Sequence, residues 1–214
     1  MIDGDPRKIE LLMKLRSQGV RDVRVLEAVE KIPRELFLPE TFALEAYADR
    51  AMPIACGQTI SQPFVVAFMT DRLKVSKRMK VLEVGTGSGY QTAILSLICR
   101  RVYTIERHRA LLTAAVRRFE QLRLANITTM LGDGLKGWPA QAPFERIIVT
   151  AAAQVLPETL LEQLAPGGIM IVPVDTNENR QELLRVTRGP KGVETERLLD
   201  VRFVPLVEGV ARDS

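Results

Sequence analysis

The chain has 214 residues, 46% of them apolar and 26% charged, and its 30 basic and 26 acidic residues give a formal net charge of +4. This balance predicts one globular domain, and no apolar run approaches the ~20 residues of a membrane span. Cys56 and Cys99 form no Cys-x-x-Cys pattern and His108 is the single histidine, so we expect neither a disulfide framework nor a metal centre.

The start of the chain and its charge pattern limit the expected location and partners. Residues 1–6 lack the layout of a signal peptide, so we expect a cytoplasmic protein without a membrane partner. The arginine pairs at 100–101 and 117–118 fall at a predicted strand edge and on a predicted helix, where a solvated face is the usual explanation. We therefore expect a monomer that binds no nucleic acid.

Residues 1–75 are predicted to form a helical extension that precedes the main fold. Asp5 and Pro6 are typical of a helix start, and leucines recur at helical spacing until Gly19. A second apolar helical face ends at Pro33, and a proline-bounded turn and a short helical segment continue to Ala48. This layer either covers one sheet edge or helps to wall a substrate groove.

A polar loop over residues 57–62 follows, with the sequence Gly-Gln-Thr-Ile-Ser-Gln. It runs into a further helix that Pro63 opens and whose aromatic side chains are expected to face inward. Taken in isolation, this loop is explained by Ser61 or Gln62 capping that helix.

From Met79 onward, short runs rich in Val, Ile and Leu alternate with helical patterns, which predicts an α/β fold with a doubly wound, mostly parallel sheet. Strands are expected near residues 80–84, 101–106, 127–131, 145–150 and 168–173, and helices near residues 89–98, 109–123 and 156–164. Two extended stretches, 182–188 and 194–206, predict a C-terminal antiparallel hairpin. We therefore interpret residues 1–214 as a single domain with its core at 76–214.

The first predicted strand ends in a glycine-rich loop, Gly85–Gly89, that opens the next helix. Ligands of open α/β sheets lie beyond the carboxyl ends of the strands, so this unit predicts a nucleotide cradle. A tight turn without a ligand is the alternative. Glu83 weakens that alternative, because an acid inside a buried strand is costly unless it is paired or solvated by a ligand. The unit predicts an adenosine-containing cofactor.

Further acids follow at the next strand ends. Glu106 comes about 20 residues after the glycine loop, a separation at which an acid accepts hydrogen bonds from ribose hydroxyls. Asp133, flanked by Gly132 and Gly134, is placed to accept the amine of adenine, although an ordinary Asp-Gly turn explains it equally well. The fourth strand end, residues 150–153, has small side chains that leave room for a substrate or serve close packing.

The glycine loop resembles the first motif of S-adenosylmethionine-dependent methyltransferases. Its spacing is Gly-x-Gly-x-Gly, whereas dinucleotide folds carry Gly-x-Gly-x-x-Gly, and Tyr90 stands where the last glycine of that pattern would be. The methyl donor carries a sulfonium and no phosphate, so an acid such as Glu83 near the loop suits it.

Five segments together resemble bacterial protein-L-isoaspartate O-methyltransferases, in the same order and over nearly the whole chain. They are Gln58–Pro63, Val81–Ala93, Gly132–Gly134, Ile148–Ala152 and Phe203–Val207. The Thr-Ile-Ser segment is peculiar to that family, while the glycine loop is shared by many methyltransferases. Val66 departs from the histidine of animal forms.

This resemblance implies methyl transfer from S-adenosylmethionine to the α-carboxylate of L-isoaspartyl residues in damaged proteins and peptides, which starts their repair to L-aspartyl. Ser61 matches the active-site serine and is expected to be catalytic. The residues expected to bind the cofactor are Thr59, Ile60, Glu83, Gly85, Thr86, Gly87, Ser88, Gly89, Glu106, Arg107, Asp133 and Gly134, and those expected to bind the substrate are Gln58, Thr59, Ile60, Ser61 and Val207.

The chemistry of that reaction agrees with the composition of the chain. A carboxylate has a pKa near ~4 and is ionised at neutral pH, so this nucleophile needs no general base. Two alternatives stay open at this stage: a methyltransferase for another carboxylate substrate, and a nucleotide-binding module without catalysis.

Overall fold

The computed structural model describes residues 5–176 and 180–212. Its main sheet consists of β3 (Lys80–Val84), β4 (Arg101–Glu106), β5 (Ile127–Leu131), β6 (Phe144–Val149), β7 (Leu164–Asp175), β8 (Gln181–Gly189) and β9 (Gly192–Val201). The strand order is β5-β4-β3-β6-β7-β8-β9, with β3 to β7 parallel and β8 and β9 antiparallel. The expected doubly wound, mostly parallel sheet with a C-terminal hairpin is confirmed.

Two apolar clusters form because successive side chains of a strand point to opposite faces of the sheet. Val81 belongs to the larger cluster and its neighbour Leu82 to the smaller one, and both are fully buried. The larger cluster takes in side chains of the N-terminal residues, such as Leu15, so the extension and the sheet share one core. Whether the chain divides near residue 75 stays a prediction.

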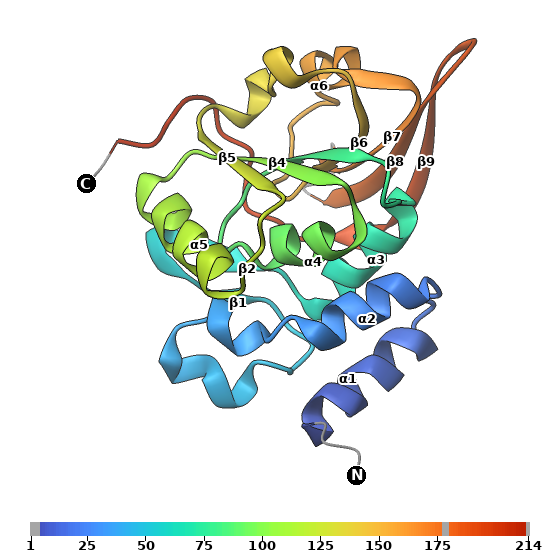
Figure 1. The fold of residues 1–214 in the computed structure, drawn as a ribbon. Helices are drawn as coiled ribbons and strands as arrows, with labels where there is room; N and C mark the ends of the chain where they lie inside the picture. Colours follow the sequence, from blue (N-terminus) through green and yellow to red (C-terminus); the bar gives the residue numbers. More distant parts are fainter. Residues whose placement is uncertain (1–4, 177–179, 213–214) are drawn as a thin grey trace.

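The helices are α1 (Pro6–Ser17), α2 (Val23–Lys31), α3 (Pro63–Leu73), α4 (Tyr90–Ile98), α5 (Arg109–Gln121) and α6 (Glu158–Glu162). Figure 1 shows α3, α4 and α5 on one side of the sheet, α1 and α2 as an outer layer beyond them, and α6 on the other side. The predicted start of α1 is confirmed, because the Asp5 side chain accepts a hydrogen bond from the Arg7 N–H.

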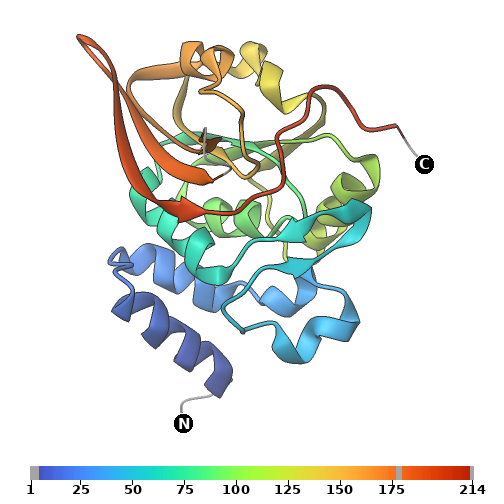
Figure 2. The same cartoon turned by 180° about the vertical axis from the view of Figure 1, so that it is seen from behind.

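The segment between α2 and α3 is more ordered than the sequence indicated. It contains three 3-10 turns, η1 (Arg34–Phe37), η2 (Glu40–Glu45) and η3 (Ala55–Gly57), and a two-stranded antiparallel ladder of β1 (Met52–Pro53) and β2 (Thr59–Ile60). The ladder is visible in cyan beside the main body in Figure 2. The predicted polar loop at 57–62 is therefore partly strand. Pairing of Ile60 with Met52 fixes the backbone immediately before the expected catalytic residue.

Two boundaries in the C-terminal half differ from the prediction. α6 is a single short helix because β7 already begins at Leu164, where it pairs with Phe144 before a bulge. β9 ends at Val201 rather than near residue 206, because its partner strand β8 begins at Gln181, the residue opposite Val201. The chain instead crosses the strand ends, where Ala152 exchanges hydrogen bonds with the carbonyl of Val204 and the N–H of Leu206.

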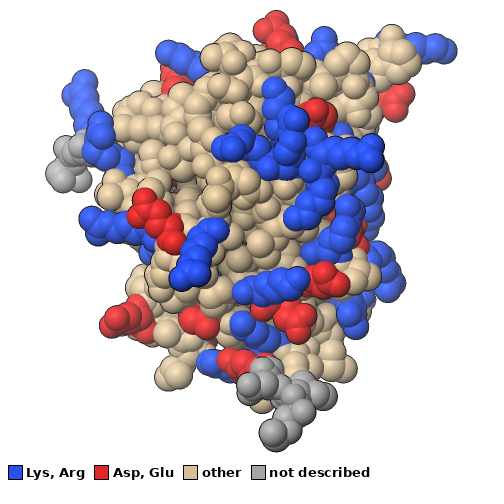
Figure 3. Space-filling view, viewed as in Figure 1, with Lys and Arg blue, Asp and Glu red and all other residues tan. Residues whose placement is uncertain are grey.

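The surface is charged throughout, and in Figure 3 Lys and Arg side chains gather on the right-hand half of the face shown, with carboxylates between them in its lower part. Within residues 5–176 and 180–212, no helix combines the length and the apolar character needed to cross a membrane.

Asp71 joins the start of α2 to the end of α3. Its side chain is 1% exposed, and it accepts hydrogen bonds from the Arg21 N–H (2.7 Å), the Asp22 N–H (3.4 Å) and the Lys74 ammonium (2.7 Å). Replacing it removes the acceptor of two backbone amides.

We predict that Asp71→Ala lowers the free energy of unfolding by about 1–3 kcal/mol, because the amides of Arg21 and Asp22 lose their buried partner. Urea unfolding followed by circular dichroism measures the change. Glu27→Ala, an exposed acid on α2, serves as the control and should stay close to the wild type. An equal loss in both variants would contradict the role given to Asp71.

Candidate functional site

A pocket of about 790 Å³, partly open to solvent, lies at the carboxyl ends of β3, β4 and β6. The chain proceeds from β3 to β4 and β5 on one side and then returns to β6 on the other side of β3. Ligands of open α/β sheets bind at this kind of reversal in strand order. The pocket therefore occupies the position that the fold itself favours for a cofactor.

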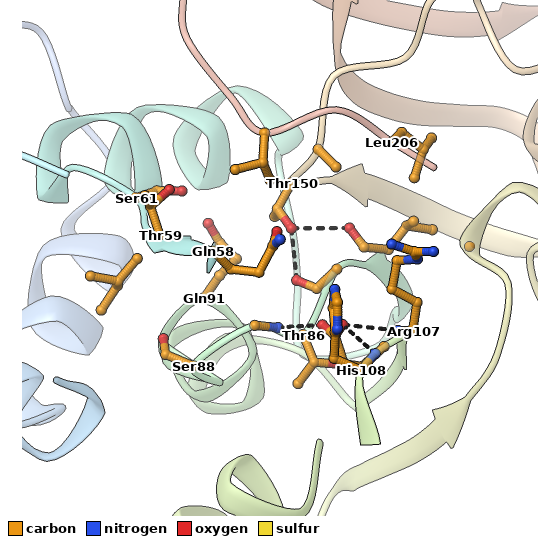
Figure 4. A pocket seen from close by; sticks show the side chains of 18 of the residues that line it. Gln58, Thr59, Ser61, Thr86, Ser88, Gln91, Arg107, His108, Thr150 and Leu206 are labelled. Carbon is orange, nitrogen blue, oxygen red and sulfur yellow. Dashed lines mark hydrogen bonds between the residues drawn. The ribbon is translucent and has the colours of Figure 1, made fainter. Parts of the chain in front are cut away.

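The structure brings most of the expected site residues together. Gln58, Thr59, Ile60, Ser61, Gly85, Thr86, Gly87, Ser88, Glu106, Arg107, Gly134 and Val207 line the pocket, whereas Glu83, Gly89 and Asp133 do not. In Figure 4, Ser61 and Thr59 lie at one side and Arg107 at the opposite side, with Gln91 and Thr150 between them. The pocket thus has a serine end and an arginine end.

The amides of the glycine loop, Gly85–Gly89, are largely bonded within the protein. The N–H groups of Gly85 and Thr86 donate to the carbonyl of Ile105 at 2.9 and 3.2 Å, and that of Gly89 donates to the carbonyl of Thr86 at 2.8 Å. A phosphate-binding loop needs such amides free to point at its anion. This loop is therefore poorly suited to the pyrophosphate of a dinucleotide.

Glu106 closes the loop from the neighbouring strand. Its Oε2 accepts from the Gly87 N–H at 2.8 Å, and its Oε1 accepts from the N–H groups of Arg107 and His108, each at 2.9 Å. An ionised carboxylate has about four acceptor positions, so one remains on Oε2. Glu106 is 5% exposed and lines the pocket, which suits a single further hydrogen bond from a ligand hydroxyl.

Asp133 forms the turn that the sequence allowed and leaves its second oxygen without a partner. Its Oδ1 accepts from the Leu135 N–H at 3.0 Å and caps the short turn η4 (Gly134–Lys136), as an Asp-Gly turn would. Its Oδ2 is buried and has no hydrogen-bond partner among the described residues. A buried acceptor without a partner is costly. Because Gly134 beside it lines the pocket, this oxygen fits the amine of an adenine ring.

Thr150 at the end of β6 packs directly on the glycine loop. Its hydroxyl lies 2.7 Å from the carbonyl oxygen of Gly85 and 3.0 Å from that of Val84. A Cβ on Gly85 would lie 2.3 Å from this hydroxyl, and Gly85 has a φ of +97°. Thr150 is therefore closely packed on the loop, and both Thr150 and Ala151 line the pocket.

The expected contact of Glu83 with the cofactor is not supported by its position. Glu83 is fully buried, does not line the pocket, and its Oε2 accepts hydrogen bonds from the hydroxyls of Thr92 and Thr104. The single hydroxyl hydrogen of Thr104 is used for Glu83, so the Thr86 hydroxyl donates to Thr104 at 2.7 Å. Glu83 is therefore bonded within the protein through Oε2, while its buried Oε1 has no partner among the described residues.

Ser61 is not a helix cap. The N-cap position of α3 is occupied by Gln62, whose side chain makes no capping hydrogen bond. The Phe64 N–H at the start of this helix donates to Asp49 Oδ1 at 2.8 Å. The hydroxyl of Ser61 is thereby left for the pocket, which it lines. The alternative explanation of this serine as a cap is wrong.

Several residues at the pocket were not singled out as site residues from the sequence. Tyr90, Gln91, His108, Ile105, Val66, Thr150 and the strap of residues Val204, Pro205 and Leu206 also line it. The strap and the two helical residues, Tyr90 and Gln91, fall inside the segments that carry the family resemblance. This resemblance was the signal that could have identified them. Nothing in the sequence around His108 indicated that it would face the cofactor pocket.

These features define a class of protein. The amides of the glycine loop are bonded within the protein, while Glu106 at the pocket has an acceptor position left and the buried Asp133 Oδ2 has no partner among the described residues. Within the Rossmann-like folds, a pocket for a nucleoside without a phosphate belongs to a methyltransferase that uses S-adenosylmethionine.

Comparison with known proteins gives the particular family. The family model described as protein-L-isoaspartate (D-aspartate) O-methyltransferase matches residues 6–211, and the chain belongs to this family. A protein-L-isoaspartate O-methyltransferase of Parvibaculum lavamentivorans is 61% identical over 216 residues, which cover 100% of this chain and 97% of the relative. That of Paramagnetospirillum magneticum is 54% identical over 100% of both chains.

Solved structures of the same family share the fold. One from Plasmodium falciparum, in complex with S-adenosyl-L-homocysteine, has a TM-score of 0.81 at 26% identity and covers 92% of this chain and 97% of that chain. A second protein-L-isoaspartate O-methyltransferase has a TM-score of 0.82 at 30% identity and covers 92% of this chain and 65% of that longer chain. The enzyme class and the cofactor expected from the sequence are confirmed.

Burial of Glu83 makes the stability of the protein depend on pH. Burial raises the pKa of the Glu83 carboxyl to about 8, against hydrogen bonds from Thr104 and Thr92 that lower it, and the charge of Glu106 raises it further. Between the ordinary value of 4.5 and about 8, the folded protein holds a proton that the unfolded chain has lost. The free energy of unfolding therefore falls as the pH rises through this window.

We predict that Glu83→Gln becomes progressively more stable than the wild type as the pH rises from about 5 to about 8, because glutamine keeps the acceptor for Thr92 and Thr104 but never ionises. Urea unfolding at a series of pH values measures the difference. The control is Glu120→Gln, an exposed position on α5 whose curve should run parallel to that of the wild type. A constant difference between Glu83→Gln and the wild type would disprove this pH dependence.

Proposed function

We propose that this pocket transfers the methyl group of S-adenosylmethionine to the α-carboxylate of L-isoaspartyl residues in damaged proteins and peptides. This is the activity of the family to which the chain belongs. Ser61, on the polar loop of residues 57–62, lines the same pocket as the glycine loop. This observation carries the assignment of residues. The product methyl ester enables repair to L-aspartyl.

The cofactor contacts are proposed from the acceptors that the protein leaves unused. Glu106 Oε2 accepts from a ribose hydroxyl and Asp133 Oδ2 from the adenine amine. Ile105 and Leu206 line the pocket near these groups and give apolar contact to the ring. When bound, S-adenosylmethionine supplies a methyl group activated by its sulfonium. Thr59 and Ile60 then lie on the substrate side of the pocket.

Ser61 is proposed to place the nucleophile. Its hydroxyl donates a hydrogen bond to one oxygen of the isoaspartyl carboxylate and leaves the other oxygen directed at the methyl group. The carboxylate is already ionised, so no residue has to remove a proton. Orientation alone can contribute about 7–11 kcal/mol to such a reaction when the reacting atoms are held in line and water is excluded. Val66, which is 2% exposed, helps to keep this part of the pocket apolar.

Repair continues after the ester leaves the enzyme. The methoxy group is a better leaving group than the original oxide, so the neighbouring amide nitrogen closes a succinimide ring. Water then opens this ring, partly to a normal aspartyl residue. Repeated cycles convert the remaining isoaspartyl product, and the protein needs no group for these later steps.

A second hollow of about 880 Å³ adjoins the pocket and is our candidate for the bound peptide. It shares Thr59, Ser61, Thr150 and Val204 with the cofactor pocket and continues along residues 200–203 at the end of β9. Isoaspartyl sites occur in many sequences, so the groove has to bind extended backbone rather than particular side chains. Gln58 and Val207 line the cofactor pocket but not this hollow.

The expected location and assembly remain proposals. We propose a cytoplasmic monomer whose macromolecular partners are isoaspartyl proteins and not nucleic acids. Two basic side chains at the amino end of β3 have structural contacts that support this: Lys77 and Lys80 each donate a hydrogen bond to a backbone carbonyl. These contacts explain the basic side chains without any binding of phosphate groups.

The activity is tested with paired peptides that contain either aspartate or isoaspartate at one position. With radiolabelled S-adenosylmethionine, we expect base-labile label on the isoaspartyl peptide and none on the aspartyl peptide, because only the former offers the α-carboxylate at the required position. A small-molecule carboxylate in competition tests the first alternative. Binding of the donor without any labelled product would instead support a module without catalysis.

We predict that Ser61→Ala lowers kcat on the isoaspartyl peptide by about 10- to 100-fold, the loss expected for one hydrogen bond to a charged group. Affinity for S-adenosylhomocysteine, measured by calorimetry, should stay the same because Ser61 contacts the substrate. Ser76→Ala, a half-buried serine outside both hollows, is the matched control. Unchanged turnover in Ser61→Ala would rule out the role given to this hydroxyl.

A further inference from the structure

Arg34 is a fully buried arginine next to the polar loop of residues 57–62, which carries Ser61. Its exposed fraction is 0%, and its Nη2 donates a hydrogen bond to the carbonyl oxygen of Ser61 at 2.8 Å. The guanidinium carbon lies 4.8 Å from the centre of the Tyr90 ring. Its Nε and Nη1 have no hydrogen-bond partner among the described residues. Arg34 lines neither the cofactor pocket nor the adjoining hollow, so it does not touch substrate or donor.

Burying a charged side chain in this position costs desolvation free energy. Burial lowers the pKa of Arg34, and the nearby Tyr90 and Asp49 offset only part of this effect. An apolar side chain of similar length would fill the same space without the desolvation cost. An apolar side chain could make neither the hydrogen bond to the Ser61 carbonyl nor the cation–π contact with Tyr90, and of the two it is the hydrogen bond that holds the segment carrying Ser61.

The turn that carries Arg34 also contacts the cofactor loop. In η1, the carbonyl of Leu36 accepts from Arg118 Nε at 2.7 Å, and Nη1 of the same arginine donates to the carbonyl of Ser88 at 3.0 Å. Phe37 packs edge-on against Tyr90 with 5.5 Å between the ring centres. One short turn is therefore bonded to the loop that carries the catalytic serine and, through Arg118, to the loop that holds the donor.

We infer that Arg34 is a positioning residue: by holding the Ser61 carbonyl to the η1 turn, it fixes the Ser61 hydroxyl at the correct distance from the donor-binding loop. This inference rests on the proposed function, because it assigns Arg34 a part in the placement of Ser61. It gives the N-terminal extension a part in catalysis, although Arg34 itself does not reach the reacting atoms.

The test is Arg34→Met, which fills the space but cannot donate a hydrogen bond. We expect kcat on the isoaspartyl peptide to fall by about 10- to 100-fold, since misplacement of a reacting group by about 1 Å costs as much. The dissociation constant of S-adenosylhomocysteine should not change, because Arg118 still holds the Ser88 carbonyl. Equal kcat, or a parallel loss of binding and turnover, would overturn the inference.

Two further variants control for folding. Arg34→Lys keeps a cationic donor near the Ser61 carbonyl and should recover part of the lost kcat, which a purely space-filling role would not produce. Arg16→Met, at an exposed position on α1, should behave as the wild type. If Arg34→Met does not fold, Arg34→Leu, which also lacks a donor, takes its place: reduced kcat with unchanged S-adenosylhomocysteine binding supports the inference, and full activity overturns it.

A double variant separates this inference from the proposed function. In the Ser61→Ala background, Arg34→Met should lower kcat little further, because the hydroxyl that Arg34 positions is already absent. A full additional loss would show that Arg34 acts independently of Ser61 and would overturn the inference. Failure of the proposed function gives a different result: the wild-type protein does not label the isoaspartyl peptide at all.

Discussion

The contact between Thr150 and Gly85 is the constraint on which the site depends. Two parallel strands, β3 and β6, diverge into different connections at this point, and the hydroxyl of Thr150 holds their ends together through the carbonyls of Val84 and Gly85. There is no room for a Cβ on Gly85, and its backbone adopts a conformation that favours glycine. With this corner fixed, the glycine loop bonds its own amides and Glu106 closes it, so the pocket is formed before any ligand arrives.

The sequence predicted the sheet because its strands are short apolar runs between turn residues, and buried parallel strands read in that way. It also predicted most of the cofactor wall, since the relevant side chains follow strand ends that meet at one edge. Glu83 shows the limit of this reasoning. A buried acid has to be paired, but spacing along the chain could not show that Thr92 and Thr104 supply the pairing.

Other features depend on contacts between distant segments and were therefore not predictable. The two-residue strands β1 and β2 are too short to have a periodic pattern, and β9 ends where its partner strand β8 begins. Arg34 lies in a proline-bounded turn, where a charged residue normally marks the surface. Its burial follows only from the way in which α2, η1 and the loop before α3 pack together. Through the η1 turn, the N-terminal layer also contacts both loops of the site.

In the hairpin of β8 and β9, the turn, where the length of the chain can vary, lies at the opposite end of the ladder from the pocket. Its turn, where Gly189 pairs with Gly192, is at one end of the ladder, while the pairing of Gln181 with Val201 is at the other, immediately before the strap that lines the pocket. Residues gained or lost in pairs at the turn lengthen or shorten the ladder without changing its register at the strap. Evolution can therefore remodel the outer tip of this ribbon, for example to dock a new neighbour, while the strap keeps its place over the donor.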